Sequence, residues 1–294
     1  MPENPLHSAA PTAETALKEG ATLLRGCTPT ASLDAALLLG HIIGVDRAWL
    51  LSRGQVQLTS AQYEHFRRLI AQRREGKPIA YITSLAGFYK RMFLVNENVL
   101  VPRPETEHLV EAAIEYLRER VRAGAQAVRV LEIGAGSGAV ACSIAAEVPQ
   151  AHVEGTDVSA HAVSIARRNA ERLGVSERCR FRQADIAGDE PAGPFDAVVA
   201  NLPYIPTADL PEKPDPAAFE PRIALDGGPD GMAVYARLLG ECAWCLRGAG
   251  VLLMEAAPAT MPRLRALTAA ALPAASVEVR RDYGGLERFL YVTP

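Results

Sequence analysis

The chain has 294 residues, 49% apolar and 22% charged, so it can form one large domain or two smaller ones with buried cores. Its net charge of −3 provides no global basic field to recruit nucleic acid. The sequence lacks an apolar run of the roughly 18 residues that a membrane span needs, and it lacks a secretion signal. Five cysteines without framework spacing fit a reducing compartment, so we expect a cytoplasmic protein without a membrane segment.

Residues 1–76 are predicted to form a small helical domain. In SLDAALLLGHIIG, apolar residues recur at helical spacing, and Ser32 or Asp34 is the predicted start signal. A second helix is expected to begin at Thr59 or Ser60 and to end at Gly76. Its basic residues are interpreted as a solvated helix face, with contact to an acidic partner as the alternative. They are Arg67, Arg68, Arg73, Arg74 and Lys77.

Residues 77–104 are predicted to be a β-hairpin linker. Apolar residues alternate on both sides of Asn96-Glu97-Asn98, which favours a turn there. Pro104 and the acidic residues after it suit the start of the next helix.

Residues 105–294 alternate between strand and helix patterns from Val128 onward, which predicts a parallel, doubly wound α/β sheet. We expect seven strands in it: VRVLEIG, HVEGTD, RCRFRQAD, FDAVVAN, GVLLMEA, VEVRRD and ERFLYV. The CxxC pair Cys242 and Cys245 is expected on a helix that runs through Leu246. Because no second pair or histidine cluster accompanies it, core packing is favoured over a zinc or redox role, and we predict no metal site.

The segment VLEIGAGSGAV places Gly134, Gly136 and Gly138 between a strand and a helix. Glycines suit a sharp turn that a ligand approaches closely, although such turns also occur for packing alone. Asp157 ends the next strand, 19 residues after Gly138, where an acid can accept both hydroxyls of a ribose. Asp185 ends the third strand, where it could accept from an exocyclic amine.

Each of the two acids could instead cap the helix that follows it. The carboxyl ends of parallel strands meet at one sheet edge, however, and ligands of open α/β sheets bind there. The three turns and Asn201 after the fourth strand therefore favour a nucleoside site.

The fourth strand runs into VVANLPYIP, where a carboxamide is followed by a rigid turn and an aromatic ring. The motif could merely terminate the strand. Alternatively, Asn201, Pro203 and Tyr204 form the floor of a pocket for a planar polar group. A planar NH₂ group needs two acceptors, which the Asn201 side chain and the Leu202 carbonyl can supply.

These blocks resemble the S-adenosylmethionine-dependent methyltransferases of Rossmann-like fold, and most closely the N5-glutamine methyltransferases of bacterial peptide chain release factors. The similar blocks cover nearly the whole chain: DAALLLGHIIG, PIAYIT, LVPRPETE, LEIGAGSGAV, ANLPYIP and FEPRIALDGGPDGM. The chain departs from the family at Leu202, which replaces the usual first Pro, at Ser84, where a Gly is common, and in EAAPATM. NLPY is also the form seen in ribosomal RNA adenine dimethyltransferases.

The resemblance implies a Rossmann-like seven-stranded methyltransferase sheet with a small N-terminal helical domain. It implies that Gly134, Ala135, Gly136, Ser137 and Gly138 hold the methionine portion of S-adenosylmethionine. Asp157 would bind the ribose, and Asp185 with Ile186 the adenine. Asn201, Leu202, Pro203 and Tyr204 would bind the glutamine side chain, with Asn201 next to the cofactor as well.

Two further segments have no assigned chemistry. PRPETE brings Arg103, Glu105 and Glu107 near the glycine loop, either to order the site or only to start a helix. FEPRIALDGGPDG is either a mobile lid or a passive connection.

The favoured function is methylation of a glutamine amide in a protein, with the Gly-Gly-Gln loop of a translation release factor as substrate and partner and without stable nucleic-acid binding. The alternatives are an amino-methyltransferase acting on adenine of ribosomal RNA, and a non-catalytic cofactor-binding protein with a helical adaptor.

Overall fold

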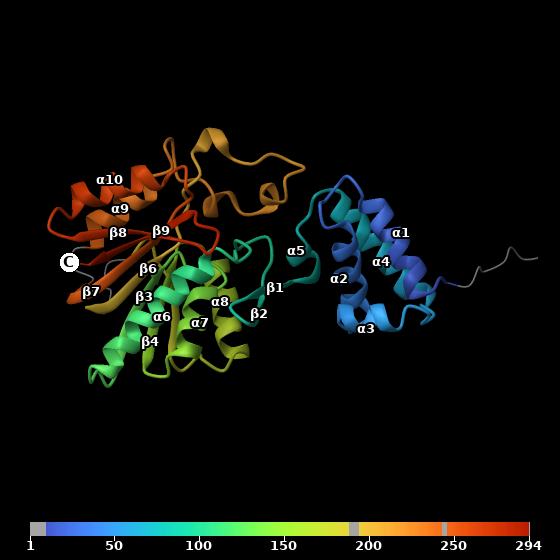
Figure 1. The fold of residues 1–294 in the computed structure, drawn as a ribbon, viewed down its shortest axis with the longest axis horizontal. Helices are drawn as coiled ribbons and strands as arrows, with labels where there is room; N and C mark the ends of the chain where they lie inside the picture. Colours follow the sequence, from blue (N-terminus) through green and yellow to red (C-terminus); the bar gives the residue numbers. More distant parts are fainter. Residues whose placement is uncertain (1–9, 188–193, 243–245, 294) are drawn as a thin grey trace, which may run out of the picture. The chain divides into compact units, whose positions relative to one another are not determined.

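The computed structural model describes residues 10–187, 194–242 and 246–293. The chain divides into two compact units (Figure 1). The helical unit comprises the N-terminal region up to Ser84 together with residues 212–219, and the sheet unit comprises residues 85–211 and 220–294.

The helical unit forms its core from apolar stripes on short helices. Thr59 caps its longest helix in a capping box with Gln62, as the sequence predicts, and Phe66, Leu69 and Ile70 of that helix are buried. From residue 10 onward, its α-helices are α1 (Ala13–Leu24), α2 (Ala31–Ile43), α3 (Arg47–Ser52), α4 (Ser60–Arg74) and α5 (Ile79–Thr83). A short 3-10 helix, η2 (Pro216–Phe219), belongs to the same unit.

The start of α2 differs from the prediction. The helix begins at Ala31 after Thr30, so neither Ser32 nor Asp34 is its start signal. The hydroxyl of Thr30 donates to Asp34 Oδ1 (2.7 Å), and Asp34 is buried. The carboxylate is therefore used inside the unit, one helical turn past the helix start.

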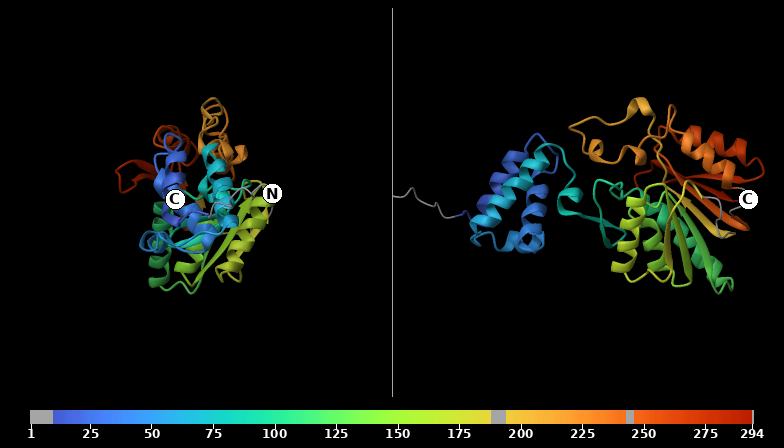
Figure 2. Two further views of the ribbon diagram at one scale, coloured as in Figure 1. Left: turned by 90° about the vertical axis from the view of Figure 1, so that its right-hand side faces the viewer. Right: turned by 180° about the vertical axis from the view of Figure 1, so that it is seen from behind.

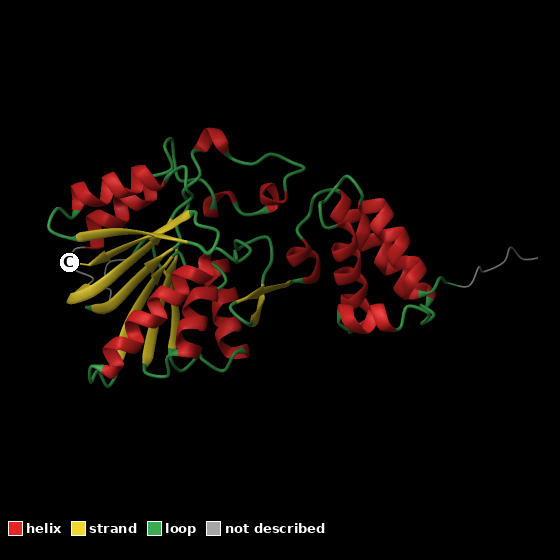
Figure 3. Cartoon of the chain, in the orientation of Figure 1, coloured by secondary structure: helices red, strands yellow, loops and turns green. Residues whose placement is uncertain are grey.

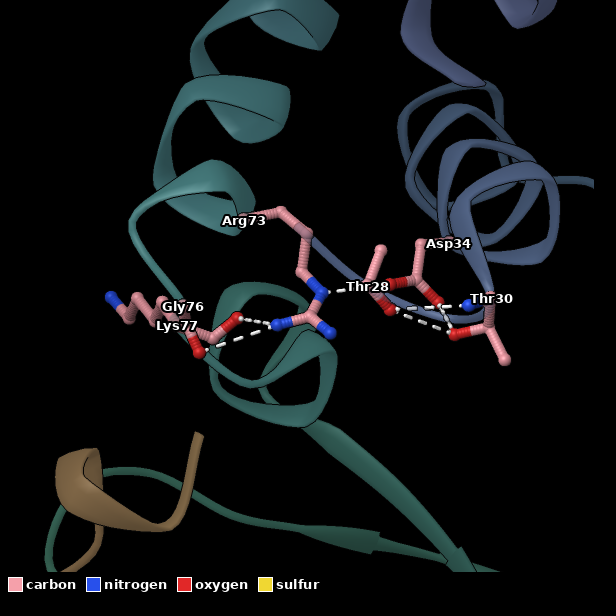
Figure 4. A network of polar contacts seen from close by, with 6 residues as sticks. All are labelled: Thr28, Thr30, Asp34, Arg73, Gly76 and Lys77. Atoms are coloured by element: carbon pink, nitrogen blue, oxygen red, sulfur yellow. Dashed lines mark hydrogen bonds and ion pairs between the residues drawn. The ribbon is translucent and has the colours of Figure 1, made fainter. Parts of the chain in front are cut away.

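A buried ion pair joins α2 to the end of α4 (Figure 4). Arg73 Nε donates to Asp34 Oδ2 at 2.7 Å, and Arg73 Nη1 donates to the carbonyls of Gly76 and Lys77 at 3.3 and 3.2 Å. The prediction of a solvated face is therefore wrong for Arg73, whose charge is neutralised in the interior. The spacing of basic residues along a helix cannot show that one of them has a carboxylate partner 39 positions away.

A hairpin lies in this part of the chain, but the predicted turn position is wrong: the two strands are joined before Asn96, not at Asn96–Asn98. Strand β1 (Leu85–Phe88) pairs antiparallel with β2 (Arg91–Leu94), and the Asn96–Asn98 segment forms a later turn. Tyr89 and Lys90 make the two-residue hairpin turn with φ of 44° and 63°. That conformation normally requires Gly, Asn or Asp, so the sequence carries no signal for a turn at these residues.

Within the described residues the sheet has seven strands, as predicted, in the order β5-β4-β3-β6-β7-β9-β8. Figure 3 shows the strands in yellow and the helices in red. Its strands are β3 (Val128–Ile133), β4 (Ala151–Asp157), β5 (Cys179–Gln183), β6 (Phe195–Ala200), β7 (Leu246–Glu255), β8 (Ser276–Arg281) and β9 (Glu287–Thr293). The pairs among β5, β4, β3, β6 and β7 are parallel, as predicted, and β9 runs antiparallel to both of its neighbours. The short connection between β8 and β9 explains this, because parallel neighbours need a longer crossover.

Helices cover both faces of the sheet (Figures 1 and 2). On one face, α6 (Thr106–Arg122), α7 (Ala139–Glu147) and α8 (Ala160–Arg172) pack on residues such as Val199 and Leu253. On the other face, α9 (Ala233–Cys242) and α10 (Met261–Ala271) pack on the alternate residues, such as Val198 and Leu252. The central strands are thus buried on both sides.

Two short 3-10 helices complete the sheet unit, and one predicted helix boundary in it is wrong. The 3-10 helices η1 (Thr207–Asp209) and η3 (Arg222–Ala224) lie between β6 and α9. The expected helix through Leu246 is wrong, since α9 ends at Cys242 and β7 begins at Leu246. The side-chain packing predicted for Cys242 and Cys245 falls outside the described residues.

Candidate functional site

A cavity of about 280 Å³ opens at the carboxyl ends of β3, β4, β5 and β6. Seven of the eight predicted positions from Gly134 to Ile186 line it, all except Gly138, together with Asn201, Leu202 and Pro203. The rest of its wall is mainly apolar and includes Phe88, as is usual for a site that binds a small molecule. Turns far apart in the sequence thus meet at one pocket.

The glycine loop is shaped by left-handed backbone. Gly134, Gly136 and Gly138 have φ of 77°, 53° and 75°, where a side chain would be strained. A Cβ on Gly134 would lie 2.9 Å from Leu202 Cδ2, whereas a Cβ on Gly136 would meet nothing within 4 Å. The loop is therefore packed on one side against the Asn201–Tyr204 turn that follows β6, and it is open at Gly136.

Asp157 faces this loop. Its Oδ2 accepts from the Gly136 N–H and its Oδ1 from the Ser159 N–H, each at 2.8 Å. Burial raises the pKa of Asp157, and the two amide hydrogen bonds oppose that rise. The cap of α8 is Ser159, which accepts from the Ala162 N–H, so capping does not explain the position of Asp157.

Asp185 and Ile186 lie at the end of β5. Asp185 Oδ2 accepts from Arg237 Nη2 at 2.6 Å, and both side chains are more than half exposed. The Thr156 hydroxyl donates to the Ile186 carbonyl at 2.6 Å and holds this turn against the end of β4. Arg237 also lines the cavity and carried no sequence signal, because it lies mid-helix in α9.

Hydrogen bonds connect the Asn201–Tyr204 turn after β6 to α6, α9 and β7. Asn201 Nδ2 donates to Thr106 Oγ1 at 3.0 Å, and the Leu202 N–H donates to the Tyr235 hydroxyl at 3.1 Å. The Tyr235 hydroxyl in turn donates to the Glu255 carbonyl. Tyr204 does not line the cavity; it packs beside the core under α9, and burial raises its pKa to about 12. That Tyr204 forms part of the floor for a planar polar group remains a prediction.

The segment after the motif is not a free loop. The Ile205 N–H donates to the Leu225 carbonyl (3.1 Å), and the Gly227 N–H donates back to the Ile205 carbonyl (2.8 Å). A Cβ on Gly231, at φ 81°, would lie 2.4 Å from the Tyr204 carbonyl oxygen. Gly231 thus permits main chain to pack directly on the motif, and this part of FEPRIALDGGPDG serves as its support.

The PRPETE residues divide by position. Arg103 lines the cavity, and its Nη2 donates to the buried Glu220 Oε1 at 2.7 Å. Glu105 lies 3.7 Å from Arg288, and Glu107 accepts from the Tyr89 N–H of the hairpin turn at 3.0 Å. Of Arg103, Glu105 and Glu107, only Arg103 therefore lines the cavity.

Four buried polar residues of the site region were absent from the prediction: Thr106, Glu132, Tyr235 and Glu255. Glu132 Oε2 accepts from the Ala141 N–H (3.0 Å), and burial raises its pKa well above the usual range. Glu255 ends β7 beside Asn201, because Ala200 pairs with Met254. The strand-end rule that found Asp157 would also have found Glu255 in LLMEA.

Burial raises the pKa of Glu255 to about 7, with Glu105 adding to the rise, while hydrogen bonds from Thr106 and Asn201 and the charge of Arg288 oppose it. Its Oε2 is buried and has no hydrogen-bond partner within the described part of the chain. Across the same residues, no helix is long and apolar enough to cross a bilayer, and no His/Cys/Asp/Glu group could hold a metal ion.

Known proteins match the chain over both units. Residues 15–83 match the PrmC N-terminal domain, and residues 130–213 match a methyltransferase domain. The release factor glutamine methyltransferase of Chlorobaculum tepidum is 40% identical over 88% of both chains. Those of Rhodopirellula baltica and Moorella thermoacetica are 38% and 37% identical, over 88% and 90% of this chain and 88% and 92% of theirs. With its glycine loop, strand-end acids and Asn-Leu-Pro-Tyr turn at one cavity, the chain belongs to the release factor glutamine methyltransferase family.

Proposed function

We propose that this chain transfers a methyl group from S-adenosylmethionine to the side-chain amide nitrogen of a glutamine in the Gly-Gly-Gln loop of a translation release factor. The observation that carries the proposal is that Asn201 and the glycine loop line the same cavity. The relatives from Chlorobaculum tepidum and Rhodopirellula baltica, both release factor glutamine methyltransferases, support the substrate class.

The residues of the cavity fit the cofactor. Gly134 to Gly138 would hold its methionine portion, because the backbone there is left-handed and is open at Gly136. Asp157 would bind the ribose: each of its oxygens accepts one N–H and has a second lone pair for a hydroxyl. Asp185 and Ile186 would border the adenine. The cofactor would supply a methyl group bonded to a positively charged sulfur.

The protein's part of the reaction is to position and activate the amide. The nitrogen lone pair of an amide is delocalised into its carbonyl, which makes the nitrogen a poor nucleophile. Asn201 Oδ1 and the Leu202 carbonyl would accept one hydrogen each and hold the nitrogen in line with the methyl carbon. Such positioning can contribute roughly 7–11 kcal/mol. The acceptors would also stabilise the positive charge that develops on nitrogen as the C–N bond forms and the C–S bond breaks. The sulfur would leave as a neutral thioether, and the methylated nitrogen would lose one of its two protons to water.

Pro203 would hold the turn, since its ring fixes φ near roughly −65°. Leu202 keeps its carbonyl and is 4% exposed, with its side chain packed against the glycine loop. The departure from the family's usual Pro at this position therefore keeps the acceptor. If the substrate is a release factor, the reaction takes place in the cytoplasm, where translation ends.

The test offers purified unmodified release factor and unmodified ribosomal RNA to the enzyme with labelled S-adenosylmethionine. We expect label on one glutamine of the release factor, located by mass analysis. Label on RNA alone would instead support the adenine methyltransferase, and cofactor binding without any product would support a non-catalytic protein. Asn201→Ala should abolish transfer while cofactor affinity stays within about twofold, because a removed acceptor affects the reacting amide and not the glycine loop.

A further inference from the structure

The carboxamide of Asn201 is useful as an acceptor only in one of its two orientations. Its oxygen accepts hydrogen bonds and its nitrogen donates them, so a flipped amide would present two hydrogens to a substrate NH₂. The turn itself does not decide between the two orientations. The groups behind Asn201 must do so.

Two buried acceptors stand behind Asn201. Thr106, the first residue of α6, is 4% exposed, and its Oγ1 accepts from Asn201 Nδ2 at 3.0 Å. Glu255, at the end of the neighbouring strand β7, is 3% exposed, and its carboxyl takes hydrogen bonds from both Thr106 and Asn201. Because the Thr106 oxygen already accepts from Asn201, its own proton is available for Glu255.

The main chain of Glu255 is also held in place by a hydrogen bond. The fully buried Tyr235 donates its hydroxyl to the Glu255 carbonyl and accepts the Leu202 N–H. One hydroxyl thus joins the peptide between Asn201 and Leu202 to the residue that faces the Asn201 amide. The arrangement comes from α6, α9 and β7, and each of these elements is packed in the core of the sheet unit.

We propose that Thr106 and Glu255 are positioning residues that fix the Asn201 carboxamide with its nitrogen turned inward and its oxygen facing the cavity. The inference rests on the proposed glutamine substrate, whose NH₂ group requires that orientation. Thr106 lines the cavity wall and Glu255 does not, so Glu255 acts through Asn201.

Thr106→Val tests the inference because it keeps the side-chain shape and removes the hydroxyl. Thr106→Ser is the matched control, since it restores the hydroxyl without the methyl group. Full-length enzyme is assayed with purified unmodified release factor, and cofactor affinity and thermal unfolding are measured for each variant. For Thr106→Val we expect kcat to fall about 10-fold or more, as for a lost hydrogen bond to a buried polar group. Cofactor affinity should stay within about twofold, and Thr106→Ser should recover most of kcat.

Glu255→Gln provides a second measurement. The glutamine keeps one acceptor oxygen and adds a donor that competes for the Asn201 oxygen, so kcat should fall while the cofactor still binds. Wild-type kcat in both Thr106→Val and Glu255→Gln would overturn the inference. Equal losses in Thr106→Val and Thr106→Ser would also overturn it, because the hydroxyl would then not be the determinant. Wild-type enzyme that is inactive on the release factor would instead overturn the proposed function, and this inference with it.

Discussion

Two buried carboxylates, Asp34 of the helical unit and Glu255 of the sheet unit, have different surroundings. In the helical unit, Asp34 is paired with Arg73 and accepts from the Thr30 hydroxyl (Figure 4). In the sheet unit, Glu255 forms no ion pair within the described ranges, and its Oε2 has no hydrogen-bond partner. The charge of Asp34 is thus neutralised by an ion pair, whereas Glu255, which lies behind Asn201, keeps a buried oxygen atom without a hydrogen-bond partner among the described residues, at a cost in stability.

The largest expected effect comes from breaking the neutralised pair. Asp34→Ala leaves the guanidinium of Arg73 buried without its carboxylate, which typically destabilises by about 3–5 kcal/mol. We expect the urea midpoint of the helical unit to fall by the corresponding amount in circular dichroism.

The double variant Asp34→Leu/Arg73→Met is the control, because replacing a whole buried pair by apolar side chains is often neutral. If Asp34→Ala unfolds at the wild-type midpoint, the pair contributes no stability and the contrast with Glu255 fails.

The second effect concerns pH. The pKa of Glu255 is about 7 in the folded protein against an ordinary value of 4.5, so the folded state keeps its proton between these values while the unfolded state loses it. Stability from this group is therefore fully present below pH 4.5, declines as pH rises to about 7, and is constant above that. The wild-type minus Glu255→Gln difference in unfolding free energy should fall by up to about 3 kcal/mol across this window.

Urea titrations at several pH values measure that difference. Asp157 and Glu132 also have raised pKa values, but both are present in the two proteins and cancel in the comparison. A difference that does not change with pH would show that Glu255 titrates normally.

The third effect isolates how Glu255 is held. Tyr235→Phe removes one hydroxyl and leaves the Leu202 N–H and the Glu255 carbonyl without that partner. Stability should fall by about 1–3 kcal/mol, measured by urea unfolding. Transfer should weaken as well, since the Leu202 peptide loses its anchor. Tyr63→Phe in the helical unit is the matched control and should leave methyl transfer unchanged. Methyl transfer by Tyr235→Phe at the wild-type rate would contradict the anchoring role.

The same comparison shows what the sequence could predict. Strand-end residues such as Asp157 and Asn201 were predictable, because sheet topology brings the carboxyl ends of parallel strands together. Helical positions such as Arg73 and Tyr235 were not, because their partners are distant in sequence and periodicity shows only that a residue faces inward. The Tyr89-Lys90 turn was missed for another reason: neither residue favours the left-handed conformation that it adopts. Glu255 was predictable in principle, since it obeys the strand-end rule.

The smallest effect on stability is expected for the exposed carboxylate of the site. Asp185 pairs with Arg237 at 2.6 Å, but both side chains are more than half exposed, so water and salt screen the pair. Asp185→Asn should change unfolding free energy by less than about 1 kcal/mol. Cofactor affinity, measured by calorimetry, should nevertheless fall, because the variant loses an acceptor at the predicted adenine edge. The Asp226–Arg222 pair, also exposed on its arginine, gives the matched control: Asp226→Asn should leave cofactor affinity unchanged. Equal cofactor affinity in Asp185→Asn and wild type would remove Asp185 from the predicted adenine site and leave it, like Asp34, a residue whose partner is an arginine.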